Sequence, residues 1–367
     1  MRIRGAVLED LGRPRPYSQS RPLTVSELDL APPEPGELLV RIEAAGLCHS
    51  DLSVVEGTRA RPVPMVLGHE AAGIVEQTTP GADDIAIGTR VVMTFLPRCG
   101  DCPGCHQGGR MPCSRGSAAN DAGSLLAGGS RITRDEVSVH HHLGVSGFAT
   151  HAVVDRRSVV PVDHDVPPEI AAVLGCAVLT GGGALLNAAY PQEGNSTMVV
   201  GLGGVGMAAL LVATSLKRGP VIGVDAVPEK LETARRLGAT DVYTPQSLGP
   251  RRADVVIEAV GSARAFETAV AATAPGGTTV AVGLPDPTAS ASISPLRLVA
   301  EGRTIIGSYL GSAVPARDIP RYAQLWREGR LPVEELISSR ISLDDINEGM
   351  DRLAAGHSIR QIIDIGG

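Results

Sequence analysis

Residue types that bind transition metals gather around one loop of the chain. Cys48-His49-Ser50-Asp51 and Gly68-His69-Glu70 place a thiol, two imidazoles and two carboxylates close together in sequence. Zn²⁺ takes sulfur, nitrogen and carboxylate oxygen in a tetrahedral shell, and a catalytic zinc site keeps one position open. Cys176 is the candidate for the remaining protein ligand. A lone buried cysteine or histidine is more often a packed core residue, so this loop alone does not decide the question.

Four further cysteines lie within one short segment. Their spacing, Cys-x2-Cys-x2-Cys-x7-Cys, is typical of a closed structural zinc site, and the glycines and proline between them let the loop wrap around one ion. An iron–sulfur cluster is the alternative, although its bacterial pattern has a tighter last spacing. Disulfides are less expected, because cytosolic chains keep their thiols reduced. The four residues are Cys99, Cys102, Cys105 and Cys113.

The cysteine count strengthens the metal interpretation of the first loop. The chain has six cysteines, and the four-cysteine segment leaves only Cys48 and Cys176. Two metal sites, one closed and one open, therefore account for every thiol. The run His140-His141-His142 is not expected to be a third site, because adjacent side chains cannot all face one ion. One of these histidines is a candidate for lining a cofactor or substrate cleft.

A dinucleotide-binding pattern follows in the second half of the chain. A short apolar strand over 197–200 precedes a G-x-G-x-x-G run, and a helix over 207–217 follows it. The first glycine allows a tight turn, the second lets the backbone approach a pyrophosphate, and the last lets helix and strand pack closely. The helix N-terminus then offers free N–H groups to the phosphates. The run is Gly201, Leu202, Gly203, Gly204, Val205 and Gly206.

Asp225 closes the next expected strand, 221–224. A carboxylate here accepts hydrogen bonds from the ribose hydroxyls of the adenosine and repels a 2′-phosphate. The residue therefore favours NAD over NADP. The alternative is that Asp225 only caps the following helix, expected over 228–237.

The distribution of expected strands and helices indicates an α/β protein of two domains. Short β-rich runs separated by prolines dominate the first part, which predicts an irregular β-barrel-like body, whereas alternating strands and helices from about residue 178 predict a parallel sheet. We assign 1–178 and 319–367 to the first domain, with the cysteine lobe at 95–115, and 179–318 to the second. The cleft between them is expected to hold the nicotinamide and the Cys48 site.

Composition sets limits on partners and location. The 367 residues carry a net charge of −7 without a basic run, so neither nucleic acid nor an anionic membrane is an expected partner. Two uncharged segments, 170–192 and 194–216, are broken by glycine clusters and suit strand-to-helix turns better than membrane spans. Charged residues follow Met1 closely, so no signal peptide is expected. The prediction is a cytoplasmic, soluble protein that binds small molecules.

These motifs together resemble the zinc-containing alcohol dehydrogenases of the medium-chain dehydrogenase/reductase superfamily. The resemblance covers nearly the whole chain, and the segment 143–148 is similar to the long-loop branch that contains the liver-type and glutathione-dependent formaldehyde enzymes. It implies a GroES-like β-barrel catalytic domain and a Rossmann domain with a doubly wound parallel sheet. It also implies a homodimer.

The resemblance assigns roles residue by residue. It implies Cys48, His69 and Cys176 as catalytic zinc ligands, with Glu70 able to approach the metal. Asp51 is implied to orient the His69 imidazole, and Ser50 to take the alcohol proton. Positions that match cofactor contacts are His49, Thr180, Asp225, Lys230 and Arg360, and positions that match the substrate pocket are Phe95 and Phe148.

The implied function is reversible hydride transfer between an alcohol and NAD, with two Zn²⁺ ions per chain. Zn²⁺ acts as a Lewis acid that lowers the pKa of the alcohol. Only three phenylalanines exist in the chain, and two at the pocket suggest an apolar, primary, aliphatic or aromatic substrate. A thiol-dependent formaldehyde dehydrogenase and a carbonyl reductase remain alternatives. A non-enzymatic NAD-binding protein would not need the three-ligand site, and a zinc-free quinone reductase would lack both cysteine sets.

Two positions depart from the family pattern. Ser53 stands where a histidine often ends the proton relay; because a hydroxyl passes a proton but cannot hold one, we expect protons to leave through water. His49 stands where a basic residue often contacts the cofactor pyrophosphate.

We predict that NADH binds more weakly, and with more dependence on pH, in the natural protein than in a His49→Arg variant. An imidazole loses its charge near neutral pH, whereas a guanidinium keeps it. Fluorescence titration of NADH between about pH 6 and 9 measures this. Equal affinities of both proteins across that range would contradict the prediction.

Overall fold

The computed structural model describes residues 1–366, which form two compact units. The first consists of Met1–Gln107, Met111–Cys176 and the tail from Ile337 onward, and the second of Gly108–Arg110 and Ala177–Leu336. The first boundary lies close to the expected residue 178. The return to the first unit occurs at Ile337 instead of 319, because residues 319–336 continue a helix and turn of the second unit.

A closed barrel forms one part of the first unit. Its strands run in the order β1, β2, β7, β8 and β4, and β4 pairs back onto β1. Most neighbouring strands are antiparallel, whereas β4 and β8 are parallel. The strands are β1 (Arg2–Leu8), β2 (Leu23–Leu30), β4 (Met65–Val66), β7 (Ile132–Arg134) and β8 (Val137–His141).

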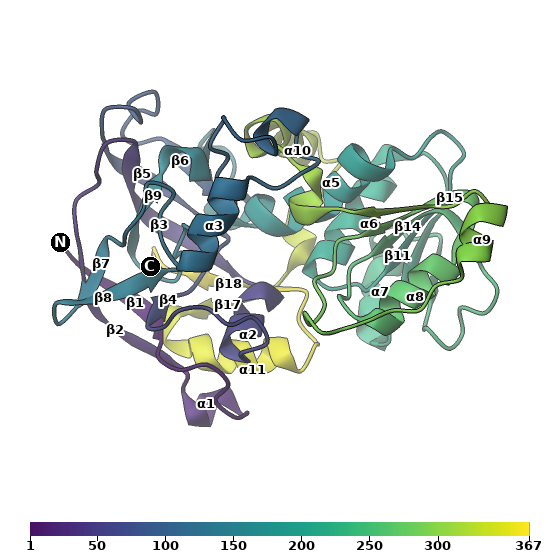
Figure 1. Ribbon diagram of the computed structural model, residues 1–367, viewed down its shortest axis with the longest axis horizontal. Helices are drawn as coiled ribbons and strands as arrows, with labels where there is room; N and C mark the ends of the chain where they lie inside the picture. The colour runs from purple at the N-terminus through teal and green to yellow at the C-terminus, as the bar shows by residue number, and fades with distance from the viewer. Residues whose placement is uncertain (367) are drawn as a thin grey trace. The chain divides into compact units, whose positions relative to one another are not determined.

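A seven-stranded sheet forms the other part of the first unit. Its order is β10-β6-β5-β3-β18-β17, and β9 also pairs with β3. Figure 1 shows the C-terminal strands in yellow beside the N-terminal ones, and the register places Gln361 opposite Leu47. The strands are β3 (Glu37–Leu47), β5 (Ala71–Thr78), β6 (Arg90–Met93), β9 (His151–Asp155), β10 (Val159–Val162), β17 (Ile337–Ser342) and β18 (Arg360–Asp364).

Short helices cover these strands. In α11 the buried Ile346, Met350 and Leu353 recur at helical spacing, so one face packs into the aliphatic core of the unit. The prolines and glycines of the first unit keep its helices short, as the sequence predicts. The helices are α1 (Tyr17–Ser20), α2 (His49–Val55), α3 (Ser114–Ala122), α4 (Pro168–Val173) and α11 (Ile346–Ala354).

The second unit contains a six-stranded parallel sheet in the order β13-β12-β11-β14-β15-β16. From the central strand β11 the chain adds β12 and β13 on one side. It then crosses back and adds β14, β15 and β16 on the other side, so the connections run in opposite directions from the gap between β11 and β14. In doubly wound sheets ligands bind at this point, outside the carboxyl ends of the strands. The strands are β11 (Thr197–Val200), β12 (Val221–Val224), β13 (Asp241–Tyr243), β14 (Ala253–Glu258), β15 (Thr273–Ala281) and β16 (Thr304–Gly307).

Helices connect the strands of this sheet. Helix α6 is apolar and mostly buried, whereas α7 buries only Leu231 and Ala234. The helices are α5 (Leu179–Gly183), α6 (Gly204–Leu216), α7 (Pro228–Arg236), α8 (Ala263–Ala271), α9 (Pro295–Ala300) and α10 (Pro315–Arg327).

One helical stretch, Pro168–Ala189, is long and apolar enough to cross a membrane by length and composition alone. Its most apolar window is 89% buried within the protein. Core helices of soluble proteins share these properties, so the stretch is weak evidence for a membrane span. It overlaps the uncharged segment 170–192, for which the sequence indicates strand-to-helix turns, whereas the structure has a buried helical stretch there.

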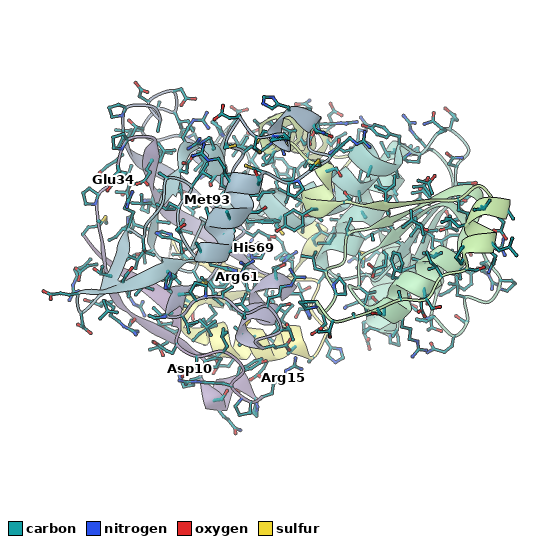
Figure 2. The ribbon with its side chains drawn as sticks, in the orientation of Figure 1. Asp10, Arg15, Glu34, Arg61, His69 and Met93 are labelled. Carbon is teal, nitrogen blue, oxygen red and sulfur yellow. The ribbon has the colours of Figure 1, made fainter. Side chains whose placement is uncertain are left out.

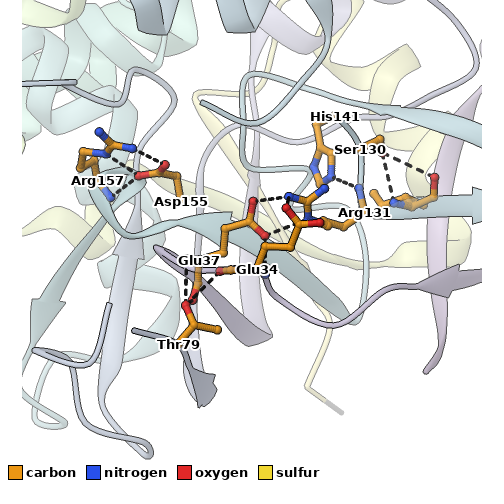
Figure 3. A network of polar contacts seen from close by, with 9 residues as sticks. Glu34, Glu37, Thr79, Ser130, Arg131, His141, Asp155 and Arg157 are labelled. Atoms are coloured by element: carbon orange, nitrogen blue, oxygen red, sulfur yellow. Dashed lines mark hydrogen bonds and ion pairs between the residues drawn. The ribbon is translucent and has the colours of Figure 1, made fainter. Parts of the chain in front are cut away.

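A buried ion network joins the barrel to the seven-stranded sheet (Figure 3). The guanidinium of Arg131 donates to both carboxylate oxygens of Glu37, each at 2.8 Å, and to Glu34 Oε2 at 2.6 Å. The Arg131 backbone N–H donates to His141 Nε2. Burial is the main reason that the pKa of His141 falls to about 3, so its imidazole is neutral. Glu37 is almost fully buried, so its charge depends on Arg131.

We predict that Glu37→Gln lowers the free energy of unfolding by about 3 kcal/mol, because within residues 1–366 it leaves the buried Arg131 guanidinium with the exposed Glu34 as its remaining charged partner. Urea unfolding followed by circular dichroism measures the loss. As a control, Asp29→Asn breaks an exposed pair with Arg2 and is expected to cost less than about 1 kcal/mol. Equal losses in the two variants would show that burial of the Arg131 pair does not matter.

Candidate metal centre and cofactor site

Cys48, His69 and Cys176 come together inside the first unit, where Figure 2 labels His69. Their ligand atoms all lie within 4.8 Å of one another, and Cys176 Sγ is 3.4 Å from His69 Nε2. All three side chains are buried. Three segments that are distant in sequence thus deliver two sulfurs and one nitrogen to one point.

The ends of regular elements position these three residues. Cys48 follows β3 and is the N-cap of α2, and His69 comes shortly after β4. Cys176 lies in a π-helical turn, Leu174–Val178, of a kind that often occurs at functional sites. Its neighbour Gly175 has no room for a side chain, since a Cβ there would lie 2.5 Å from the carbonyl oxygen of Met93.

The donor set fits Zn²⁺. Bond lengths of about 2.3 Å to sulfur and about 2.0 Å to nitrogen place tetrahedral ligands roughly 3.5–3.8 Å apart. The observed sulfur-to-nitrogen distance of 3.4 Å is close to this range. Two thiols and one imidazole would hold such an ion and would leave it one open coordination position.

The Asp51 carboxylate anchors this cluster from within the protein. Its Oδ1 accepts a hydrogen bond from His69 Nδ1 at 3.0 Å and from the Gly68 N–H at 3.2 Å. Its Oδ2 accepts the Cys48 N–H at 3.1 Å. Because Nδ1 of His69 is used in this way, Nε2 is the nitrogen that faces Cys176.

The ionisation of these groups follows from burial and mutual contact. Burial alone would raise the pKa of Asp51, but the imidazoles of His69 and His142 outweigh it and lower the pKa to about 2. A hydrogen bond from Cys176 lowers the pKa of Cys48 well below its usual value, and Arg360 adds to this effect. The pKa of Cys176 is raised in turn by that hydrogen bond and by burial. The cluster thus holds one readily formed thiolate.

Glu70 and Arg360 face each other beside the cluster. The Arg360 Nε lies 3.5 Å from Glu70 Oε1, and Arg360 Nη1 donates to the Leu47 carbonyl at 3.2 Å. Burial raises the pKa of Glu70 to about 7, although Arg360 opposes the rise. Glu70 is not among the residues whose ligand atoms meet around Cys48. Arg360 is buried against Glu70, because β18 pairs with β3 at this point, and its contact with the cofactor stays a prediction.

His142 is a site residue that the sequence did not single out. Its Nδ1 lies 3.2 Å from Asp51 Oδ1, and its ring meets the His69 ring edge to face at a centroid distance of 5.7 Å. Burial lowers the pKa of His142, and Asp51 opposes the fall. The run of three histidines contained the signal, because His142 directly follows β8 and can point away from His141.

The four cysteines of the lobe lie together in the first unit. The sulfur-to-sulfur distances are 3.8 Å between Cys99 and Cys105, 3.6 Å between Cys102 and Cys105, and 3.8 Å between Cys102 and Cys113. A zinc tetrahedron with sulfur bonds of about 2.3 Å has edges of about 3.8 Å, so the donor set fits. Cys113 also caps α3, where its sulfur accepts the Gly116 N–H.

The two expected pocket phenylalanines take different places. The Phe95 ring meets the His69 ring edge to face at 5.4 Å, and Asn120 of α3 donates to the Phe95 carbonyl at 2.7 Å. Phe148 is 0% exposed and packs in the core cluster of the first unit, and its assignment to the substrate pocket stays a prediction. Its backbone pairs with Ala6 and Leu67, which directs the ring into the core.

The glycine-rich loop of the second unit has the geometry that the pattern predicts. Gly201 adopts φ +94°, which favours glycine, and a Cβ at Gly206 would lie 1.7 Å from the Gly201 carbonyl oxygen. Gly203 faces open space and is the N-cap of α6 without a side-chain cap bond. The first N–H groups of α6, from Gly204 and Val205 onward, are therefore suited to bind phosphate.

The remaining predicted contacts lie as follows. Asp225 accepts hydrogen bonds from the Leu202 N–H at 2.7 Å and the Val227 N–H at 2.9 Å, which ties it to the glycine-rich loop. His49 is exposed and Ser50 half-buried in the first turn of α2. Ser53 Oγ donates to the His49 carbonyl at 2.8 Å. Thr180 is buried in α5, and Lys230 is half-buried on α7.

Comparisons with known proteins identify both units. Residues 34–164 match the alcohol dehydrogenase GroES-like domain, and residues 204–328 match the zinc-binding dehydrogenase family. The chain is 32% identical to the class-3 alcohol dehydrogenase of Drosophila melanogaster over 362 residues, which is 95% of each protein.

Solved structures agree with this assignment. Benzyl alcohol dehydrogenase from Acinetobacter calcoaceticus is 30% identical with a TM-score of 0.91, and 99% of each chain is covered. An alcohol dehydrogenase zinc-binding domain protein from Burkholderia ambifaria is also 30% identical, with a TM-score of 0.90 and the same coverage. The chain therefore belongs to the zinc-containing alcohol dehydrogenases of the medium-chain dehydrogenase/reductase superfamily, oxidoreductases that use zinc and a nicotinamide cofactor.

Proposed function

We propose that the protein is a zinc- and NAD-dependent alcohol dehydrogenase with two Zn²⁺ ions per chain. The observation that carries the proposal is the buried cluster of Cys48, His69 and Cys176, with all ligand atoms within 4.8 Å. These three residues would hold the catalytic ion. The four cysteines of the lobe would hold a second, structural ion, whose shell they fill completely.

The proposed division of labour follows from the chemistry of each group. When bound, Zn²⁺ supplies Lewis-acid chemistry toward an alcohol oxygen, and the nicotinamide cofactor accepts the hydride. Asp51 holds the His69 imidazole in one tautomer and orientation. Ser50, in the first turn of α2, takes the alcohol proton. Phe95 packs against His69 and keeps water from this side of the site.

NAD is the proposed cofactor. Asp225 directly follows β12 and is tied by hydrogen bonds to Leu202 and Val227. Its carboxylate keeps lone pairs for the ribose hydroxyls and repels a 2′-phosphate. Thr180 and Lys230 are proposed as further cofactor contacts, and His49 as the residue at the pyrophosphate.

The proposed substrate is an apolar primary alcohol. The contact of Phe95 with the His69 ring and the likeness to a benzyl alcohol dehydrogenase support this proposal, and Phe148 is kept as a proposed pocket residue. The likeness to a class-3 alcohol dehydrogenase supports a thiol-dependent formaldehyde dehydrogenase as the second candidate.

A cytoplasmic homodimer is the proposed state of the protein. In support, β16 is an edge strand of the parallel sheet, with hydrogen-bonding groups available on its outer side. The neighbouring α9 exposes Leu296 and Val299 at 77% and 79%. An exposed apolar helix next to a free strand edge is suited to association with a second copy.

A substrate panel tests the function. We expect the purified protein to reduce NAD in the presence of benzyl alcohol and other apolar primary alcohols, with NADP at least about tenfold less effective, because Asp225 repels the extra phosphate. The panel includes formaldehyde with and without glutathione. A rate that requires both formaldehyde and the thiol would establish the second candidate, and no turnover of any alcohol or aldehyde would refute the proposal.

We predict that the two metal sites can be separated by mutation. Cys48→Ser is expected to lose about one of two zinc ions per chain and to lower kcat roughly a hundredfold or more. Cys113→Ser is expected to lose the other ion and to lower the melting temperature, because the lobe depends on its metal for folding. Elemental analysis counts the zinc. Retention of both ions by Cys48→Ser would contradict the assignment.

A further inference from the structure

Glu258 is a buried carboxylate at the carboxyl end of β14. The residue is 2% exposed. Within residues 1–366 its contacts are backbone N–H groups, and no cationic side chain pairs with it. Buried acids normally have a cationic partner or a metal, because an uncompensated charge in the interior costs several kcal/mol. The proposed chemistry of the enzyme does not use this residue.

The carboxylate closes the loop that follows β14. Glu258 Oε1 accepts the Val260 N–H at 2.9 Å and the Gly261 N–H at 2.8 Å. Burial raises the pKa of Glu258, and the N–H groups of Gly261, Val260 and Gly283 oppose the rise because they stabilise the charged form. The loop is thus folded back onto the end of its own strand.

The same residue also reaches the loop after β15. The Glu258 carbonyl accepts the N–H groups of Val282 at 2.9 Å and Gly283 at 3.1 Å. A Cβ at Gly283 would lie 2.2 Å from the Gly261 nitrogen and 2.7 Å from Glu258 Oε2. The two loops therefore meet backbone to backbone at the carboxylate.

The glycine-rich loop rests against this junction. A Cβ at Gly201 would lie 2.9 Å from the Val260 nitrogen, and Gly201 has no space for one. The Ala259 N–H also donates to the Val200 carbonyl at 2.9 Å. The loops after β11, β14 and β15 thus pack together as one loop cluster. This cluster lies at the carboxyl ends of the strands, where doubly wound sheets bind their ligands.

Two apolar side chains project from this loop cluster. Val260 and Leu284 are 52% and 45% exposed, although both are next to tightly packed backbone. Polar side chains would be more usual at such exposure. Apolar side chains here are suited to contact the rings of a bound dinucleotide.

We infer that Glu258 is a positioning residue for the nicotinamide cofactor: its carboxylate holds the loops after β14 and β15 against the glycine-rich loop. This inference depends on the proposed role of the second unit in NAD binding. A carboxylate is suited to this task because it offers acceptors to several N–H groups at once, whereas an apolar residue would leave those groups unpaired.

The test compares two carboxylate-to-amide variants of the zinc-loaded protein. Glu258→Gln keeps the size of the side chain but removes its charge and one of its two acceptor oxygens, so the amide cannot accept the N–H groups of both loops. Glu267→Gln is the matched control, because this acid on α8 contacts the Ser292 N–H and not the junction. Fluorescence titration measures the Kd of NADH, and hydrogen exchange measures the amides of 259–262 and 282–284 without cofactor.

For Glu258→Gln we expect a rise of about tenfold or more in the Kd of NADH, faster amide exchange in both loops, and unchanged zinc content. The control is expected to stay within about twofold of the natural protein. Gly283→Ala disturbs the same junction without removing the acid and is also expected to weaken NADH binding. This second variant provides the test if Glu258→Gln does not fold.

An unchanged Kd in folded Glu258→Gln, even with a lower melting temperature, would overturn the inference and leave Glu258 a purely structural residue. An unchanged Kd in Gly283→Ala would overturn it too. A natural protein that fails to bind NADH would instead refute the proposed function. The two failures are therefore distinguishable.

Discussion

The candidate metal centre depends on the buried carboxylate of Asp51. It accepts hydrogen bonds from the Cys48 N–H, the Gly68 N–H and His69 Nδ1, and so fixes two of the three proposed ligands relative to each other. Its neighbours compensate the cost of burial, which is why its pKa falls to about 2. The carboxylate is therefore ionised near neutral pH, where it holds the Nδ1 side of His69.

Three other buried acids show that the groups around a carboxylate determine what it does in the structure. Glu37 pairs with Arg131 in two parallel hydrogen bonds, an arrangement that stabilises the fold of the first unit. The Glu258 carboxylate accepts hydrogen bonds from loop N–H groups, so its charge is stabilised only while the loop keeps this position. Glu70 is the least compensated, since both of its oxygens lack a hydrogen bond in the described residues and Arg360 lies 3.5 Å away. Its pKa, raised to about 7, reflects this.

Local patterns in the sequence predicted most of the fold. The strands Thr197–Val200 and Val221–Val224 lie where their β-branched residues indicate. The helices α2 and α3 were not predicted, because α2 is only seven residues long and α3 has a polar sequence without a periodic apolar face. Both begin at a cysteine N-cap, Cys48 and Cys113. Pairing between distant strands, such as β18 with β3, has no local signal at all.

The same limit applies to side-chain contacts at the site. Phe148 and Arg360 were assigned by likeness of position, whereas the core packing of Phe148 and the contact of Arg360 with Glu70 depend on distant segments that pair with each backbone. The sequence did not single out His142 among the three adjacent histidines, because its contact with Asp51 joins residues far apart in the chain. The meeting of Cys48, His69 and Cys176 was predictable only because the cysteine count left no other use for two of them.

The two units therefore differ in what a sequence can reveal. In the second unit the proposed cofactor contacts come largely from backbone N–H groups, and close backbone contacts require glycine at Gly201 and Gly206, so the binding loop is visible as a pattern. In the first unit the chemistry comes from side chains of several segments that are far apart in the sequence. The sequence around each side chain does not show which distant residues it contacts. Glu258 lies between these cases: a single acid with no motif, whose partners are the backbone of loops that the pattern does identify.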